Sequence, residues 1–395
     1  MSRAVPAERE PLLTAAFLTL WLVGFFQEMS WGLMIHLPGY LRQLGATEAS
    51  IGLVYASGAI VALALRPVMG RAIDQWGRKL VFVTGGLVLT ASIVAYIPLA
   101  SFGPLVFLVR MVHSSVEIML FTTLLAFGAD LVPVSRRTQG LALLGISGLL
   151  PIGLGSILGD VVLAGASYDR VLAFSAALAL TSWAFAWRLP AIPPVDPHRE
   201  QHRGFRLVAV QRDLRPVWLL TLGFALGITT LFTFTRTYVD VTGIGSVGLY
   251  FGVYAFVAIL VRIFGSGRAD RRGAHRVLVP AMVFYAAQFV VLAVTSSTTG
   301  MVFAGGLGGL GHGLLFPIIT TLVVSRATDE ERGTALAVFS GLLDLVTLVA
   351  APLAGALIVA SGYGVTYAVI GLVILGALVG FLAWDPKTRP TGPAS

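Results

Sequence analysis

Long apolar runs follow one another along almost the whole chain, and each is about as long as a bilayer is thick. A helix that crosses a membrane needs about 20 mostly apolar residues. Twelve runs approach or exceed this length, with approximate cores at 13–38, 50–69, 80–100, 104–131, 140–164, 171–189, 217–241, 247–264, 277–296, 300–324, 333–360 and 364–384. The pattern predicts an all-α integral membrane protein with twelve transmembrane helices.

The composition also indicates that the solvent of this chain is lipid. Charged residues make up 12% of the sequence and hydrophobic residues 56%, whereas soluble proteins carry about 25% charged residues. The chain has no cysteine, which excludes disulfides and thiolate metal sites. The first apolar run is too long for a cleaved signal peptide, so we expect it to be retained.

A short basic segment between two apolar runs occurs twice, half a chain apart. The first copy runs from Gly70 to Lys79 and the second from Gly267 to Arg276. Three pairs of residues keep a spacing of 196 positions, and these are Arg66 and Arg262, Asp74 and Asp270, and Gly77 and Gly273. Because 196 is half of the 395 residues, we predict two halves built on one plan. The predicted halves are 1–189 and 217–395, joined by a polar linker at 190–216.

The first copy resembles the loop between the second and third helices of the major facilitator superfamily of transporters. The family pattern reads Gly-x-x-x-Asp-Arg-x-Gly-Arg-Arg/Lys, and it is matched by Gly70, Asp74, Gly77, Arg78 and Lys79. Gln75 stands where the family usually has arginine, and the second copy keeps Asp270, Arg271 and Gly273. The resemblance covers essentially the whole chain because the number of apolar runs also fits. It implies two pseudo-symmetric six-helix bundles, most like the efflux branch for drugs and metabolites.

The distribution of basic residues predicts the orientation in the membrane. The N-terminus, the C-terminal tail and the loops on the same side as the repeat segments hold 21 of the 27 lysines and arginines. The opposite loops hold Arg42 and Arg170. Cytoplasmic loops carry the excess of basic residues in membrane proteins. We therefore expect both termini in the cytoplasm and the chain in the cell (inner) membrane. The placement also explains the net charge of +8 without nucleic acid as a partner.

Ionisable side chains within the apolar runs are the candidate functional residues. Placing one in a membrane costs a few kcal/mol, so it marks a functional site by default. Our candidates for binding substrate or protons are Glu28, Arg110, Glu117, Arg236, Asp240, His312 and Asp344. The first, fourth, seventh and tenth helices of the resembled family line its central cavity. All of these candidates except Asp344 fall on the corresponding runs.

Helical spacing supports part of this set. Arg110, Ser114 and Glu117 recur at i, i+4 and i+7 and so share one face of a helix. Arg236 and Asp240 stand at i, i+4 and could pair with each other. The alternative for all of these residues is a buried contact that only holds helices together.

The residues around the repeat segments are expected to act as gate elements. Arg66 and Arg262 lie one turn before their segments, which favours either a gate salt bridge or snorkelling to the membrane surface. The resemblance implies that the first segment locks helix 2 against helix 11 in one state of the transporter. It extends a gate role to Gly70, Asp74, Gly77, Arg78, Asp270 and Gly273.

These observations predict a secondary transporter that works by alternating access, and no enzyme. We expect proton-coupled efflux of a small amphipathic drug or metabolite, with Glu28 and Glu117 as the proton-coupling carboxylates. The alternative is proton-coupled uptake or exchange of an organic anion held by Arg110 and Arg236. A more distant alternative is a membrane sensor that transports nothing. We expect a monomer in lipid, with no cofactor and no bound metal.

Overall fold

The structure is a computed structural model, and it describes residues 11–133, 136–164, 167–192, 205–272, 274–328 and 331–385. These residues form thirteen helices and no strand. The helices before the predicted linker are α1 (Ala15–Met34), α2 (Leu37–Gln43), α3 (Glu48–Trp76), α4 (Arg78–Val94), α5 (Pro104–Leu131), α6 (Arg137–Leu163) and α7 (Tyr168–Ala186). The later helices are α8 (Phe205–Ala209), α9 (Arg215–Thr242), α10 (Val247–Arg272), α11 (Ala274–Val294), α12 (Thr298–Arg326) and α13 (Arg332–Trp384).

Helices occupy all twelve predicted apolar runs, and the predicted all-α membrane fold is confirmed. The first run is divided between α1 and α2, while α13 covers both of the last two runs. Nine spans in the described part of the chain are long and apolar enough to cross a membrane, and α4 and α7 are not among them. Membrane crossing by these two helices therefore stays a prediction, although α4 packs against α5 and α7 and α7 packs against α1.

Local sequence explains where several helices begin and end. The hydroxyls of Thr14, Thr47 and Ser297 each accept a hydrogen bond from a backbone N–H in the first turn of the helix that follows. Gly77 of the first repeat segment has φ +83° and separates α3 from α4. Gly362 has φ +81° and divides the long α13 into two straight parts. Glycine adopts such conformations without the steric cost that a Cβ would add.

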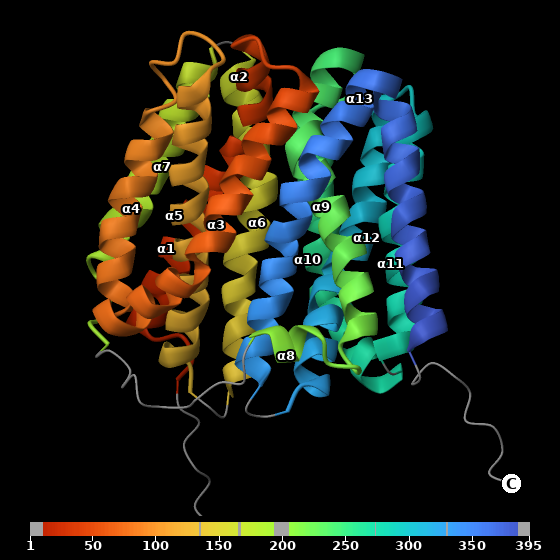
Figure 1. The fold of residues 1–395 in the computed structure, drawn as a ribbon. Coiled ribbons are helices and arrows are strands. Elements are labelled where there is room, and N and C mark those ends of the chain that lie inside the picture. The colour runs from red at the N-terminus through yellow and green to blue at the C-terminus, as the bar shows by residue number, and fades with distance from the viewer. Residues whose placement is uncertain are drawn as a thin grey trace, which may run out of the picture.

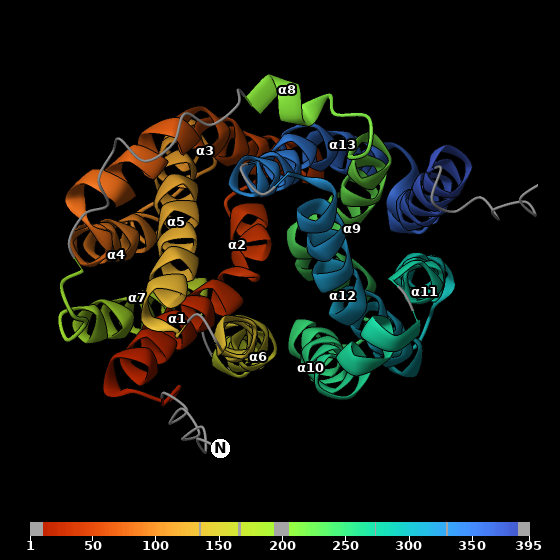
Figure 2. The ribbon, with the colours of Figure 1, turned by 90° about the horizontal axis from the view of Figure 1, so that it is seen from below.

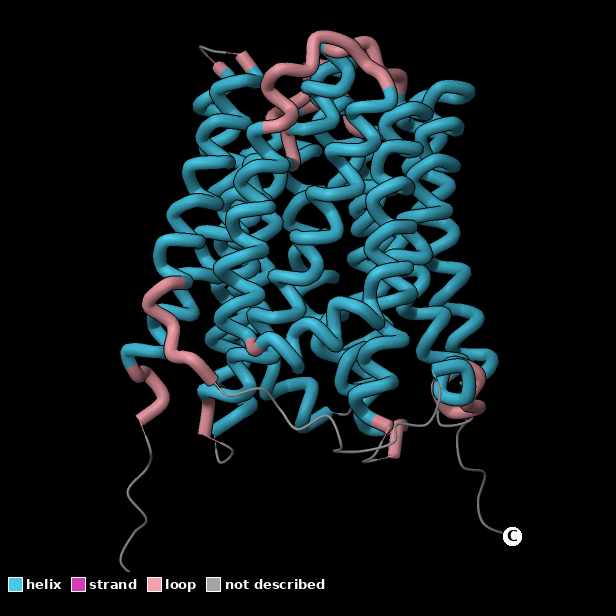
Figure 3. The backbone as a smooth tube through the Cα atoms, turned by 60° about the vertical axis from the view of Figure 1, so that its left-hand side comes forward, coloured by secondary structure: helices cyan, strands magenta, loops and turns pink. Residues whose placement is uncertain are grey.

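The helices before and after the linker gather on opposite sides of the molecule (Figures 1 and 2). α1–α7 form one group and α9–α13 the other, and nearly all loops lie at the two ends of the helices (Figure 3). The short helix α8 lies across the end that carries the repeat segments (Figure 1). The division into 1–189, a linker and 217–395 stays a prediction, because residues 193–204 of the linker lie outside the described residues.

Two seams join the groups. In the first, α3 packs on α13, and in the second, α6 packs on α10. A Cβ added to Gly52 of α3 would overlap the carbonyl oxygen of Ala351, and one added to Gly248 of α10 would lie 2.6 Å from the Cα of Ile157. Both contacts fall toward the end away from the repeat segments. Small residues allow such backbone approach between membrane helices, so the groups are closed against each other there.

The outward faces of the helices carry large apolar side chains. Phe256, Phe264 and Leu372 each expose more than 60% of their surface, and polar groups such as Gln288 and Thr366 are fully buried. Backbone polar groups are satisfied within the helices, as a lipid environment requires. This distribution fits a protein surrounded by lipid.

Candidate functional site

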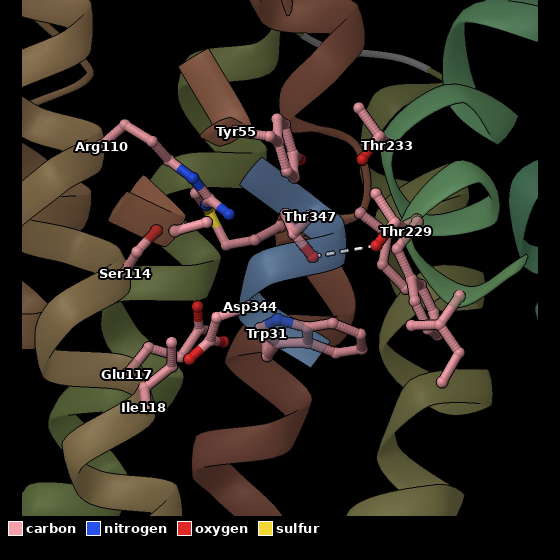
Figure 4. A pocket seen from close by; sticks show the side chains of 15 residues that line it. Trp31, Tyr55, Arg110, Ser114, Glu117, Ile118, Thr229, Thr233, Asp344 and Thr347 are labelled. Carbon is pink, nitrogen blue, oxygen red and sulfur yellow. Dashed lines mark hydrogen bonds between the residues drawn. The ribbon is translucent and has the colours of Figure 1, made fainter. Parts of the chain in front are cut away.

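A cavity of about 200 Å³ lies between the two helix groups, and we call it the central cavity (Figure 4). Side chains of α1, α3 and α5 line it from the first group, and side chains of α9 and α13 line it from the second. Its polar lining residues are Arg110, Ser114, Glu117, Thr229, Thr233, Asp344 and Thr347, and its aromatic ones are Trp31, Tyr55 and Phe232. A site shared by both groups changes shape whenever the groups move relative to each other.

Helix α5 supplies the three residues that the sequence placed on one stripe. Arg110, Ser114 and Glu117 all line the central cavity and extend from α5 toward the other helices (Figure 4). The guanidinium carbon of Arg110 lies 4.2 Å from the centre of the Tyr55 ring, a cation–π contact that holds the side chain in place.

Arg110 has no carboxylate within ion-pair distance among the described residues, and its buried Nε has no hydrogen-bond partner there. The buried hydroxyl of Ser114 also lacks a partner in the described part of the chain. The cavity thus presents a cation and a hydroxyl that are available to a bound molecule. A planar guanidinium is well suited to a carboxylate, a phosphate or a carbonyl oxygen.

The two carboxylates predicted to couple protons occupy different positions. Glu117 lines the cavity, and its Oε2 lies 3.8 Å from Nε2 of His113 one turn earlier. Glu28 of α1 is half-buried and does not belong to the cavity lining. Glu28 on α1 and Glu117 on α5 belong to the same helix group, and of the two only Glu117 lines the cavity.

Asp344 and Arg66, which were assigned different roles from the sequence, form one ion pair. The Nε of Arg66 donates to Oδ2 of Asp344 over 2.7 Å, and Nη2 donates to the backbone oxygen of Ser340 over 3.1 Å. Asp344 also lines the central cavity. The pair links α3 to α13, so it joins the two helix groups at the edge of the cavity.

Arg236 and Asp240 pair with each other, as their spacing allowed, but neither lines the central cavity. They belong instead to a group of ionisable residues, the Asp160 cluster, which consists of His36, Asp160, Arg236 and Asp240. Asp160 of α6 accepts a hydrogen bond from the backbone N–H of Gly248 over 2.6 Å. Its other oxygen lies 3.7 Å from Arg236 and 3.8 Å from His36. The cluster crosses between the helix groups at the end away from the repeat segments.

His312 was predicted in the site but lies inside the second helix group. Its Nδ1 is 2.5 Å from the hydroxyl of Tyr254, and its ring packs against Phe224 and Phe316. Only 7% of its surface is exposed, and it does not line the central cavity. In the described conformation this imidazole packs inside the second helix group and does not face the central cavity.

The residues of the repeat segments are described in part. Gly70 lies within α3, and Arg78 at the start of α4 pairs with Asp130 of α5 over 3.0 Å, within the same helix group. Gly273 and the side chains of Asp74 and Asp270 lie outside the described residues. Arg262 forms no salt bridge with a described residue, in contrast to Arg66.

Sequence reasoning did not identify Tyr55, Phe232 or Thr347, which also line the cavity. Aromatic and hydroxyl side chains are common on membrane helices, so no local pattern separates these residues from ordinary packing. The described residues contain no group of three or more histidines and carboxylates placed to hold a metal ion.

Comparison with known proteins identifies the fold. The chain is 26% identical over 360 residues to an uncharacterized MFS-type transporter of Salmonella typhimurium, covering 88% of this chain and 90% of that protein. It is 27% identical over 417 residues to the uncharacterized MFS-type transporter YhhS of Escherichia coli O157:H7, covering 98% and 96%.

Solved structures of transporters have the same fold. A point mutant of the nucleoside transporter NupG superposes with a TM-score of 0.77 at 17% identity, covering 93% of this chain and 99% of that one. The human organic anion transporter MFSD10 gives a TM-score of 0.70 at 16% identity, covering 93% and 98%. At these identities the likeness concerns the fold alone.

The family model for the Major Facilitator Superfamily matches residues 17–305 and, in a second match, residues 243–395. Together the matches include every helix that lines the central cavity and both seams. The chain therefore belongs to the Major Facilitator Superfamily and is a multi-pass membrane transporter rather than an enzyme.

Proposed function

We propose that this transporter is a proton-coupled antiporter that exports a small amphipathic solute. The observation that carries the proposal is the lining of the central cavity, where two carboxylates, a guanidinium and three aromatic rings surround about 200 Å³. Pockets for drug-sized ligands measure about 300–1,000 Å³, so this volume favours a smaller solute.

The lining favours a solute with one apolar and one polar face. Trp31, Tyr55 and Phe232 offer ring surfaces, while Ser114 and Thr233 offer hydroxyls. Aromatic walls with a few polar groups are typical of sites that orient amphipathic ligands.

Glu117 gives the proposed site a means of coupling. Its carboxylate can bind a proton or a donor group of the solute, but one excludes the other. Mutually exclusive binding at one site leads to exchange of solute for protons. Glu28 lies on α1, which packs against α5, and would tune this competition through its charge without lining the cavity.

Movement of the two helix groups would expose the site to either side of the membrane in turn. The Asp160 cluster and the close backbone contacts hold the groups together at one end. With the repeat segments in the cytoplasm, as the basic residues predict, the described conformation would be closed to the outside. Opening to the outside would require the contacts of Asp160 with Gly248 and Arg236 to part.

Transport in proteoliposomes tests the proposal. We would load vesicles with radiolabelled methylphenylpyridinium, a small aromatic cation, impose a pH gradient and follow its movement together with internal pH. Wild-type protein should move the cation against protons, and Glu117→Gln should abolish the coupled movement. Asp169→Asn, which changes an exposed carboxylate at the start of α7, is the matched control and should behave as wild type. Equal coupled flux in wild type and Glu117→Gln would contradict the proposal.

A second function, exchange of an organic anion, is favoured by one observation, the absence of a carboxylate partner for Arg110 among the described residues. The same vesicles loaded with benzoate separate the two functions. Arg110→Ala should abolish benzoate exchange while Glu117→Gln spares it, whereas proton-driven efflux should show the reverse pattern. Benzoate exchange that survives Arg110→Ala would exclude this second function.

A further inference from the structure

Arg262 on α10 is a cation without a counter-charge among the described residues. Its Nε is buried and has no hydrogen-bond partner there, and no described carboxylate pairs with it. Its guanidinium carbon lies 5.8 Å from the ring centre of Phe316, and Nη1 lies 3.9 Å from the point where a Cβ on Gly145 of α6 would stand. A desolvated charge without a partner is costly, so the described contacts leave this site incomplete.

The repeat shows what is missing. Arg66, 196 positions earlier, pairs with Asp344 of α13 in the first seam. The same spacing relates Asp344 to Gly148 of α6 in the second seam. Among the described residues, a Cβ added to Gly148 would meet no atom within 4 Å, and one added to Gly145 would meet only Arg262. The second seam thus has space and a cation where the first seam has an ion pair.

The surroundings of Arg262 favour an anion. Phe316, which faces the guanidinium, also packs against His312, and the hydroxyl of Tyr254 contacts that histidine. Neither Tyr254 nor His312 carries a negative charge at neutral pH. The side chain as a whole is partly exposed, although its Nε is buried. None of these residues lines the central cavity, which makes this a separate site.

We propose that Arg262 binds a monovalent anion at the α6–α10 seam. The bound anion would pair with Arg262 there, as Asp344 pairs with Arg66 at the α3–α13 seam. The anion is either an inorganic halide or the carboxylate of an organic solute. The two sources share one chemistry, a single negative charge that accepts hydrogen bonds from the guanidinium. The proposal does not depend on which solute crosses the central cavity.

Thermal unfolding of the purified full-length protein in detergent tests this inference. The protein is kept in a zwitterionic buffer with little salt, and sodium chloride or sodium benzoate is titrated in separate series. Wild-type protein should show a saturable rise in Tm, because a ligand that binds the folded state stabilises it. Arg262→Gln should weaken the response about tenfold or more, which corresponds to about 1.4 kcal/mol.

A second variant, which supplies a counter-charge within the protein, tests the proposal even where Arg262→Gln folds poorly. Gly145→Asp places a carboxylate beside Arg262 and should remove the response to added anion while keeping the Tm of the unliganded protein at least as high. Gly145→Asn, nearly the same in shape but neutral, should retain the wild-type response.

Saturation with chloride would assign the site to a halide, and saturation with benzoate alone would assign it to a carboxylate solute. Identical responses in wild type and Arg262→Gln would overturn the proposal, as would equal responses in Gly145→Asp and Gly145→Asn. The absence of any response to both salts in wild type would overturn it as well.

Discussion

The α3–α13 seam and the α6–α10 seam follow one plan but carry their charges in different places. Arg66 and Asp344 form an ion pair in the first seam, at the edge of the central cavity. In the second seam the matching arginine, Arg262, has no acidic partner among the described residues, and the acidic group, Asp160, lies nearer the opposite end. The repeat therefore sets where the helices lie, while individual side chains decide which contacts hold each end.

This asymmetry suits a transporter that alternates between two states. Contacts at one end must be broken while those at the other form, so each end needs an interaction of its own. The Asp160 cluster serves the end away from the repeat segments, and the pair of Arg66 with Asp344 holds the α3–α13 seam further toward the repeat segments. The predictions that follow test the two seams against each other.

The largest effect is expected from breaking the ion pair of the first seam. Asp344→Asn leaves the charge of Arg66 without its partner and should lower the free energy of unfolding by about 2–3 kcal/mol, somewhat less than for a fully buried pair. Thermal or denaturant unfolding in detergent measures the loss. The double variant Arg66→Gln/Asp344→Asn should recover part of it, since it leaves no isolated charge. Equal losses in the single and double variants would argue against a specific pair.

A smaller effect is expected from the glycine that allows the first seam to close. A Cβ at Gly52 would overlap a backbone oxygen of α13, so Gly52→Ala must push the helices apart. The substitution should cost about 1–2 kcal/mol of unfolding free energy in the same assay. Gly148→Ala in α6, where a Cβ meets no atom of the described residues within 4 Å, is the matched control and should change stability little. If the two variants unfold alike, the described closure of the first seam does not contribute to stability.

The smallest effect concerns the way Arg110 is held in the cavity. Tyr55→Leu removes the ring that faces the guanidinium at 4.2 Å and should weaken binding of a cavity ligand by about 0.5–1 kcal/mol, a factor of roughly 2–5. Tyr55→Phe keeps the ring and should bind as wild type. Isothermal titration with the transported solute measures both, and a stronger loss for Phe than for Leu would point to the hydroxyl instead.

The sequence was sufficient for the helices but less so for the site. Apolar length and the 196-residue spacing are properties of the chain itself, and helices formed at all twelve runs. Arg110, Ser114 and Glu117 share one face of α5, which their spacing along the chain is enough to predict, and all three line the cavity. The break between α1 and α2 falls within the first predicted run and was not distinguished from the helices around it, whereas Gly362 falls between the last two predicted runs.

Contacts between helices depend on how each helix is rotated and tilted, and spacing along one helix does not contain this information. Glu28 and His312 lie on runs that correspond to cavity-lining helices, yet neither side chain belongs to the lining. Asp344 lies on a run that does not correspond to a cavity-lining helix of the family, yet it lines the cavity and pairs with Arg66. Asp160 was not among the candidate residues, and only the structure places it between the two groups.

The central claim is that the cavity between the helix groups opens to each side of the membrane in turn. The chain has no cysteine, so a single introduced cysteine reports its own exposure without a prepared background. Ser114→Cys places a thiol in the cavity, and Val112→Cys places one on the opposite, exposed face of the same helix. The rate of modification by a membrane-impermeant thiol reagent is measured in right-side-out and inside-out vesicles.

Ser114→Cys should react mainly from the side of the repeat segments, and adding Asp160→Asn should raise its reaction rate from the opposite side. Val112→Cys should remain unreactive from both sides, since lipid covers it. A Ser114→Cys thiol that reacts from neither side, or whose rates do not respond to Asp160→Asn, would contradict alternating access through this cavity.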